Sequence, residues 1–220
     1  MTPSLDLELQ PTVYQGQFGA FSITEDDRNG VKLYRASLFI AALCWAIGSG
    51  LTIGLSTIPF GVLTVLYAVF SLALGIALGM IHIYMKVLHR ALQVFWAIGS
   101  GVGIVLATIA FQQHQSLAEY VAQHSLSIVG LGFTFVALNG IFFKEAFCFN
   151  RLETKLLVAI VPTLLLGHLF GGLSVEIEKY LLLTSAALFL IFALRKAFQA
   201  IPDDIGDKSV FEYLEREGAR

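Results

Sequence analysis

The sequence is short of charge, and long stretches have none at all. Asp, Glu, Lys and Arg make up 14% of the 220 residues, whereas about a quarter is usual for a soluble domain. Five segments lack all four residue types: 36–81, 91–118, 120–143, 156–175 and 180–194. About 18 or more uncharged apolar residues suffice to cross a bilayer core roughly 30 Å thick. The composition therefore excludes an ordinary soluble domain and predicts an integral membrane protein.

Cysteines and targeting signals are scarce too. The only cysteines are Cys44, in an apolar run, and Cys148, in a polar connection, which excludes a disulfide framework. The first ten residues, MTPSLDLELQ, are acidic and lack a basic segment followed by an apolar one. We therefore expect neither a signal peptide nor a transit peptide.

The hydrophobic pattern predicts an all-α membrane protein. The six expected spans are 36–58, 60–83, 91–112, 122–143, 156–174 and 178–194. The first uncharged segment is too long for one helix, and Pro59 with Gly61 divides it. The predicted fold is a six-span helical bundle built as three hairpins over residues 36–196. An N-terminal arm, 1–35, and a C-terminal tail, 197–220, flank it.

Basic residues predict the orientation, since cytoplasmic loops carry the excess of Lys and Arg. With a cytoplasmic N-terminus, thirteen of the fourteen basic residues lie inside and only Lys179 lies outside. An odd number of spans would destroy this segregation. Both termini are therefore expected in the cytoplasm.

One six-residue string, WAIGSG, occurs twice, at 45–50 and 96–101. Both copies fall in spans that run outward, which suggests duplication of a hairpin in parallel. Small residues let helix backbones approach closely in lipid, where hydrophobicity does not drive helices together. We predict that the glycines of this motif and the small residues one turn later pack helices: Gly48, Gly50, Gly54, Gly99, Gly101 and Gly103. A phosphate cradle is disfavoured because it needs a loop or a helix N-terminus in water.

Asp, Glu, Lys and Arg are missing from the predicted spans, apart from Glu178 and Lys179 at the start of the last one, so histidines, Cys44 and neutral polar groups remain. His168, which we place well inside span five, and His82 are weak candidates for holding haem or another cofactor. A hydrogen-bonded histidine in a helix contact is the commoner case. The histidine spacings match no metal-ligand pattern, so no metal or other cofactor is expected.

The connection between spans four and five is the most distinctive polar stretch. The residues that would form a reactive or partner-docking loop there are Glu145, Cys148, Asn150, Arg151 and Glu153. Basic neighbours favour a thiolate at Cys148, but no histidine adjoins it to act as a base. An interfacial anchor with local salt bridges is the alternative interpretation. Outside the spans, residues 13–23 predict a short hairpin, and 209–217 predict a short helix with a capping box.

Three stretches together carry a resemblance: Tyr14-Gln-Gly-Gln-Phe-Gly19, Leu33-Tyr-Arg-Ala-Ser-Leu38 and Lys144-Glu-Ala-Phe-Cys-Phe149. They resemble a family of integral membrane proteins of unknown function from cyanobacteria and plant plastids. The resemblance implies a multi-pass protein of a bacterial plasma membrane or thylakoid membrane. The resemblance implies no activity and assigns no functional residues.

Three functional hypotheses follow from the sequence. The first is a non-enzymatic accessory or assembly factor for a larger membrane complex, with the bilayer, other membrane proteins or a second copy as partners and no nucleic acid. The second is a small-solute channel or uncoupled carrier, with Ser49, Thr52, Ser100 and Asn139 lining the path. The third is a membrane enzyme or haem or metal protein that uses His168, His82 or Cys148.

The orientation gives the first testable prediction. A protease-sensitive tag fused to either end is expected to be protected from protease added to intact cells, and to be cut once the membrane is opened. Cleavage of either tag in intact cells would contradict the predicted topology.

Overall fold

The computed structural model describes residues 13–16, 19–81, 83, 85–201, 205, 207 and 213. The chain forms two compact units: one comprises residues 33–199, and the other comprises 1–32 with 200–220. In chain order the elements are β1 (Val13–Gln15), β2 (Ala20–Ser22), α1 (Glu25–Gly54), α2 (Phe60–Met80), α3 (Lys86–Gln112), α4 (Leu117–Gln123), α5 (Ser127–Phe149), α6 (Leu152–Leu169) and α7 (Val175–Phe198).

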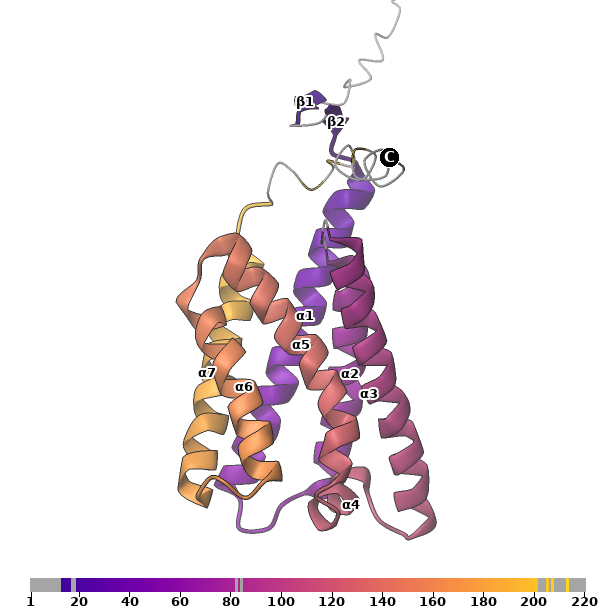
Figure 1. Ribbon diagram of the computed structural model, residues 1–220, viewed down its shortest axis with the longest axis vertical. Helices are drawn as coiled ribbons and strands as arrows, with labels where there is room; N and C mark the ends of the chain where they lie inside the picture. The colour runs from indigo at the N-terminus through magenta and orange to yellow at the C-terminus, as the bar shows by residue number, and fades with distance from the viewer. Residues whose placement is uncertain are drawn as a thin grey trace, which may run out of the picture. The chain divides into compact units, whose positions relative to one another are not determined.

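Six described helices, all except α4, are long and apolar enough to cross a membrane. The predicted all-α fold with six candidate spans is therefore confirmed. The helices alternate in direction (Figure 1), and Pro59 stands at the N-cap of α2, where the first uncharged segment was expected to divide. Several boundaries differ from the prediction, and two of them differ most. The first helix begins at Glu25 instead of 36, and α5 continues to Phe149 instead of ending at 143.

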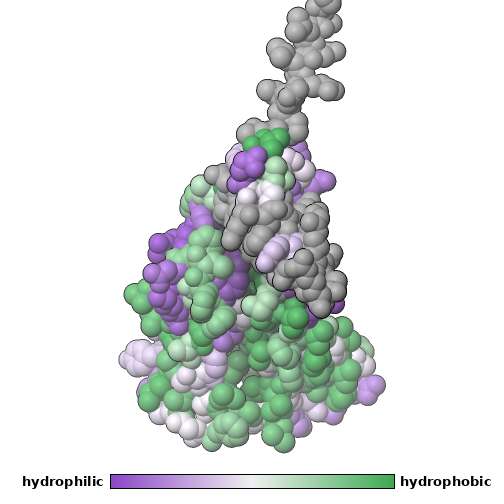
Figure 2. All heavy atoms as spheres, turned by 45° about the horizontal axis from the view of Figure 1, so that its top comes forward, coloured by the Kyte–Doolittle hydropathy of each residue, from purple (hydrophilic) through white to green (hydrophobic). Residues whose placement is uncertain are grey.

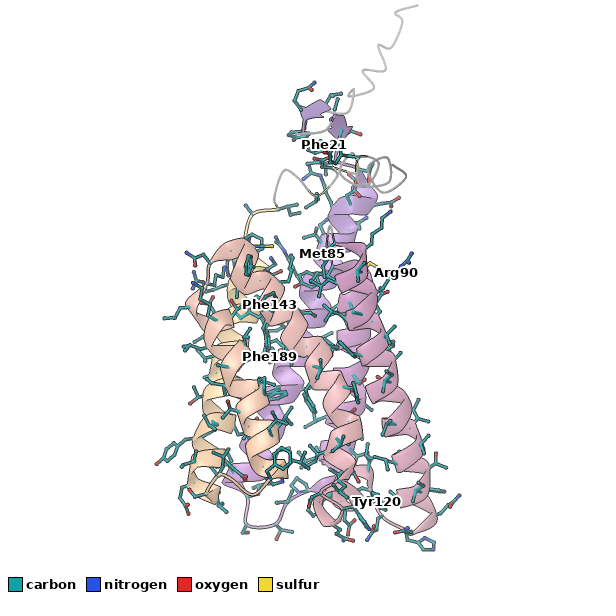
Figure 3. The ribbon with its side chains drawn as sticks, in the orientation of Figure 1. Phe21, Met85, Arg90, Tyr120, Phe143 and Phe189 are labelled. Carbon is teal, nitrogen blue, oxygen red and sulfur yellow. The ribbon has the colours of Figure 1, made fainter. Side chains whose placement is uncertain are left out.

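The connections of the bundle lie at two ends (Figure 1). At one end are the α2–α3 and α5–α6 connections and the end of α7. We call this the charged end, because Lys144, Arg151 and Arg195 lie there. Figure 2 shows hydrophobic residues over much of the helical surface on the face in view. Figure 3 shows Phe143 near the charged end and Tyr120 at the opposite end. This distribution suits a bundle whose sides meet lipid and whose ends meet water.

The helices pack in a chain of neighbours: α2 against α3, α3 against α5, α5 against α6, and α6 against α7. Trp45 of α1 contacts this chain at several points. Its ring lies edge-on to Phe135 of α5, with 5.4 Å between centroids, and its Nε1 donates to Ser185 Oγ of α7 at 3.1 Å. The largest fully buried side chains are Phe142, Phe189 and Phe192. They form the core between α5 and α7.

The two tryptophans of the repeated WAIGSG motif have equivalent roles. Trp45 Nε1 donates to a side chain of α7, and Trp96 Nε1 donates to the Ser71 carbonyl of α2 at 2.7 Å. Ser100 of the second copy also meets α2, through a 2.7 Å hydrogen bond between its hydroxyl and that of Ser71. An indole N–H in lipid needs an internal partner. Each copy of the motif therefore joins its own helix to another by a hydrogen bond.

The glycines expected to pack helices have different surroundings. A Cβ added at Gly99 of α3 would lie 2.4 Å from the Thr134 backbone nitrogen of α5, and one at Gly103 would lie 3.3 Å from Leu131. At Gly48 the nearest atom is 3.7 Å away, on Leu63 of α2. Three of the glycines would meet nothing within 4 Å: Gly50, Gly54 and Gly101. The closest approach among these positions is thus between α3 and α5.

The smaller unit contains the predicted hairpin, which is confirmed. β1 and β2 pair antiparallel with Tyr14 opposite Phe21, and the two rings stack with 5.6 Å between centroids. Next along the chain, Thr24 caps the start of α1, where the Asp27 N–H donates to Thr24 Oγ1 and the Thr24 N–H donates to Asp27 Oδ2. The helix predicted at 209–217 lies outside the described residues, except for Tyr213.

The contrast between two glycines of one motif is directly testable. Gly99→Ala is expected to destabilise the protein by about 1–3 kcal/mol, because the new methyl group overlaps the α5 backbone. Gly101→Ala is the matched control, because its methyl group enters open space. Thermal unfolding of the purified protein in detergent measures both. Equal midpoints for the two variants would contradict the α3–α5 contact.

Candidate functional site

Two carboxylates are buried at the charged end of the bundle. Glu145, in the last turns of α5, is 0% exposed, and Glu153, in the first turn of α6, is 6% exposed. An ionised group that leaves water needs a partner of opposite charge and further hydrogen bonds, or it destabilises the fold. The surroundings of these two side chains therefore define the site.

Glu145 receives three donors from three helices. Lys196 of α7 donates to Glu145 Oε2 at 2.8 Å, Lys144 of α5 donates to Oε1 at 3.1 Å, and Tyr34 of α1 donates to Oε1 at 3.2 Å. The Lys196 side chain is itself 7% exposed. Both members of the central ion pair are thus buried, and the donors of Glu145 bring α1, α5 and α7 together at one point.

Aromatic rings complete the surroundings of Lys196. Its Nζ lies 4.0 Å from the centroid of the Phe149 ring and 5.9 Å from that of Tyr34. A ring face attracts an ammonium group, and more strongly where water is excluded. Lys196 is therefore held by one carboxylate and two ring faces, which accounts for a lysine so close to the apolar core.

Glu153 forms a second, more peripheral group. Arg195 of α7 lies 3.1 Å from it, and Arg151 lies 3.9 Å from it. Arg151 also donates to Gln199 Oε1 at 3.1 Å. Because the Arg195 side chain is 57% exposed, this pair contributes less than the Glu145 pair. It nonetheless connects α6 to α7 beside the first group.

Asn150 makes the sharp turn between α5 and α6. Its φ of 49° and ψ of 39° are left-handed, and it stands at the C-cap of α5, a conformation that asparagine tolerates better than most residues. Lys155 donates to its side-chain oxygen. This turn places Glu145 and Glu153 on consecutive helices at the same end of the bundle.

The predicted loop residues are thus only partly brought together. Glu145, Asn150, Arg151 and Glu153 take part in the two ion-pair groups or in the turn between them, whereas Cys148 is exposed and belongs to neither group. Tyr34, Arg195 and Lys196 also take part, and they are not among the site residues expected from the sequence. A usable signal existed, because the predicted topology puts all three on the same side of the membrane as Glu145.

The histidine candidates lie elsewhere. His168 is in the last turn of α6, half exposed, instead of well inside a span, and its Nδ1 donates to Glu178 Oε1 at 2.9 Å. That contact joins α6 to α7 at the end opposite the charged end. His82 lies outside the described residues. Within the described part of the chain, no group of three or more His, Cys, Asp or Glu side chains is placed to hold a metal ion.

Comparison with known proteins identifies the family. Residues 76–213 match the family described as "Uncharacterized integral membrane protein (DUF2301)". The chain belongs to this family. The match includes both buried carboxylates and their α7 partners, while Tyr34 and the first WAIGSG precede it. Searches of curated proteins and of solved structures gave no match. The family and the helices agree that the protein is a multi-pass integral membrane protein.

Removal of one member of the buried pair tests the site. Glu145→Leu leaves Lys196 unpaired, and Lys196→Met leaves Glu145 with fewer donors, so each is expected to cost about 3–5 kcal/mol of unfolding free energy. The double variant is expected to cost clearly less than the sum of the two, because neither charge then remains buried. Denaturant unfolding in detergent measures this cycle.

Glu176→Gln is the control for that cycle, because Glu176 is an exposed carboxylate at the other end of α7. It is expected to leave stability within about 0.5 kcal/mol of the wild type. Additive single effects of less than about 1 kcal/mol at Glu145 and Lys196 would show that the pair is not buried as described.

Proposed function

We propose that the protein is a non-enzymatic accessory or assembly factor, which binds another membrane protein at its charged end. The observation that carries the proposal is a set of exposed apolar side chains beside the buried ion pairs. Phe147 and Phe198 are 81% and 88% exposed, and Leu152 is 68% exposed. They belong to α5, α7 and α6, the helices that the two ion-pair groups hold together.

The type of side chain supports this role. At a bilayer interface, Trp and Tyr are the favoured aromatic residues because they have both an apolar body and a polar group. Phenylalanine has no such group, so its exposure at the charged end is better satisfied by an apolar protein surface. The ion pairs fix the helices that present these side chains, which lowers the entropy cost of binding.

The channel hypothesis gains no such support. Its four expected polar residues lie on three helices, and each makes a hydrogen bond within the helix packing. Ser49 and Thr52 donate to the Trp45 and Gly48 carbonyls of their own helix. Ser100 bonds Ser71, and Asn139 donates to the Val158 carbonyl. We therefore propose the accessory role alone, in the plasma membrane or the thylakoid membrane of a cyanobacterium, as the resemblance suggests.

Cross-linking from Cys148 tests the proposal. Cys148 is exposed and Cys44 is buried, so a thiol-directed photo-cross-linker added to native membranes reacts chiefly at the charged end. We expect one discrete protein adduct, which Phe147→Ser weakens at least fivefold. Phe111→Ser is the matched control, because Phe111 is equally exposed but ends α3 at the opposite end. Adducts with lipid alone, or an adduct unaffected by Phe147→Ser, would overturn the proposal.

A further inference from the structure

The two ends of the larger unit, residues 33–199, carry opposite net charge. The charged end has only two acidic residues, Glu145 and Glu153, and both are buried. It has eight basic residues: Arg35, Lys86, Arg90, Lys144, Arg151, Lys155, Arg195 and Lys196. At the opposite end one basic residue, Lys179, accompanies three acidic ones: Glu119, Glu176 and Glu178. The charged end therefore has an excess of six positive charges, and such an excess attracts anions.

Arg195 of α7 is well placed to bind an anion. Its side chain is 57% exposed, and its Nη1 donates to Glu153 Oε2 at 3.1 Å. That bond fixes the guanidinium group, whereas Nε and Nη2 have no partner among the described residues. A guanidinium presents its N–H groups as a rigid fork. The edge formed by Nε and Nη2 can therefore donate two parallel hydrogen bonds to a phosphate group.

Arg195 also lies at the depth of lipid phosphate groups. The α7 helix has 24 residues, so it is about 36 Å long and exceeds a hydrocarbon core of roughly 30 Å by a few ångströms. Arg195 comes three residues before the end of α7, so its backbone lies about 13 Å from the middle of the helix. Its long side chain reaches from there to the edge of the hydrocarbon core.

Apolar side chains of two helices continue from Arg195 toward the middle of the bundle. Ile191, one turn earlier in α7, is 46% exposed, and Leu156, one turn after Glu153 in α6, is 43% exposed. The two helices pack against each other, and the ion pair between Arg195 and Glu153 joins them one turn nearer the charged end. A molecule with a phosphate group at Arg195 can therefore lay its hydrocarbon along both helices.

We propose that this surface of α6 and α7 binds one anionic phospholipid. Its phosphate accepts hydrogen bonds from Arg195, and its acyl chains pack on Ile191 and Leu156. An anionic headgroup fits better than a zwitterionic one, because a zwitterionic headgroup has an ammonium group of its own that the excess positive charge repels. The positive end of the α6 dipole, at Arg151, favours the same charge.

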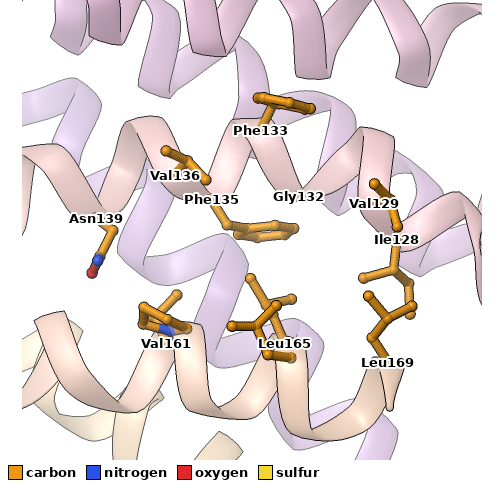
Figure 4. A pocket seen from close by; sticks show the side chains of 12 residues that line it. Ile128, Val129, Gly132, Phe133, Phe135, Val136, Asn139, Val161, Leu165 and Leu169 are labelled. Carbon is orange, nitrogen blue, oxygen red and sulfur yellow. The ribbon is translucent and has the colours of Figure 1, made fainter.

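The pocket of about 290 Å³ between α5 and α6 provides a contrast. Its lining contains no charged side chain and is apolar except for Asn139. Figure 4 shows Asn139 at one end of the pocket and Leu169 at the other. Hydrocarbon that enters this pocket meets no charge that would select its headgroup. The pocket is therefore an internal control for lipid contact without headgroup selection.

Photolabelling in phosphatidylcholine vesicles tests the proposal on the full chain. The probes are phosphatidylglycerol and phosphatidylcholine with identical acyl chains, each with a diazirine close to one ester group. Mass spectrometry locates the labelled residues. The phosphatidylglycerol probe is expected to label residues 152–159 and 187–194 about fivefold more than the phosphatidylcholine probe, the effect of one basic residue at a membrane surface. Pocket residues on α5 are expected to label equally with both probes.

Two charge variants on one helix form a matched pair. Arg195→Gln is expected to lower phosphatidylglycerol labelling of residues 187–194 about fivefold, to the level of phosphatidylcholine. The variant is expected to fold, because a half-exposed ion pair contributes little stability. Lys179→Gln removes a basic residue from the other end of α7 and is expected to leave labelling unchanged.

The proposal does not rest on the accessory role. Phe147→Ser removes a side chain of the proposed partner surface and is expected to leave lipid labelling unchanged, so the two proposals fail separately. A competition on the wild type needs no variant at all. At equal concentration, unlabelled phosphatidylglycerol is expected to displace the probe, whereas phosphatidylcholine and water-soluble glycerol phosphate are not.

Four results would overturn the proposal. Equal labelling of α6 and α7 by the two probes, or labelling that Arg195→Gln does not reduce, indicates ordinary boundary lipid. An equal preference at the start of α3, which has Lys86 and Arg90, indicates only a general attraction to the charged end. Displacement by glycerol phosphate indicates a phosphate site that does not require lipid. Absence of labelling at α6 and α7 indicates that a protein surface, such as the smaller unit with its eleven acidic and five basic residues, covers Arg195.

Discussion

The structure of the bundle at its charged end depends on a carboxylate buried without access to water. Glu145 lies where an unpaired charge would destabilise the fold, so it needs donors from neighbouring helices in addition to Lys144 of its own helix. Lys196 and Tyr34 supply them from α7 and α1. Satisfying one side chain thus selects which three helices meet. The Glu153 group and the left-handed turn at Asn150 bring α6 to the same place. The exposed phenylalanines are therefore carried on helices whose relative positions are fixed.

The middle of the bundle is held differently. Lipid tails solvate apolar side chains as well as protein does, so helices associate there through close contact and internal hydrogen bonds. Gly99 lets α3 approach the α5 backbone at Thr134, and the two repeated tryptophans each donate to another helix. The same rule applies at Pro162 of α6, which has no N–H for the Val158 carbonyl one turn earlier, so that Asn139 donates to this carbonyl instead.

Much of the fold could be predicted from the sequence, because uncharged apolar runs long enough to cross a bilayer indicate helices that are surrounded by lipid. Helix ends could not. Charged residues were taken to end the spans, but α5 continues through Lys144 and Glu145, since charges paired inside the protein do not stop a helix. Only part of the site could be predicted, because a sequence does not show which distant residues come into contact. Glu145 and Glu153 stood out, but their partners Tyr34, Lys196 and Arg195 on other helices lie 111, 51 and 42 residues away. Glycines were recognisable, yet spacing alone does not say which face of a helix meets a neighbour, as Gly99 and Gly101 demonstrate.

Hydrogen–deuterium exchange of the wild type and Glu145→Gln, in the same bilayer discs, tests the central claim most directly. If the buried carboxylate joins α1, α5 and α7, the neutral amide is expected to speed exchange together in peptides covering residues 33–38, 142–149 and 189–196. Peptides from the Gly99–Thr134 contact are expected to keep their wild-type rates. Unchanged exchange at all three helix ends, or faster exchange at α5 alone, would contradict the account.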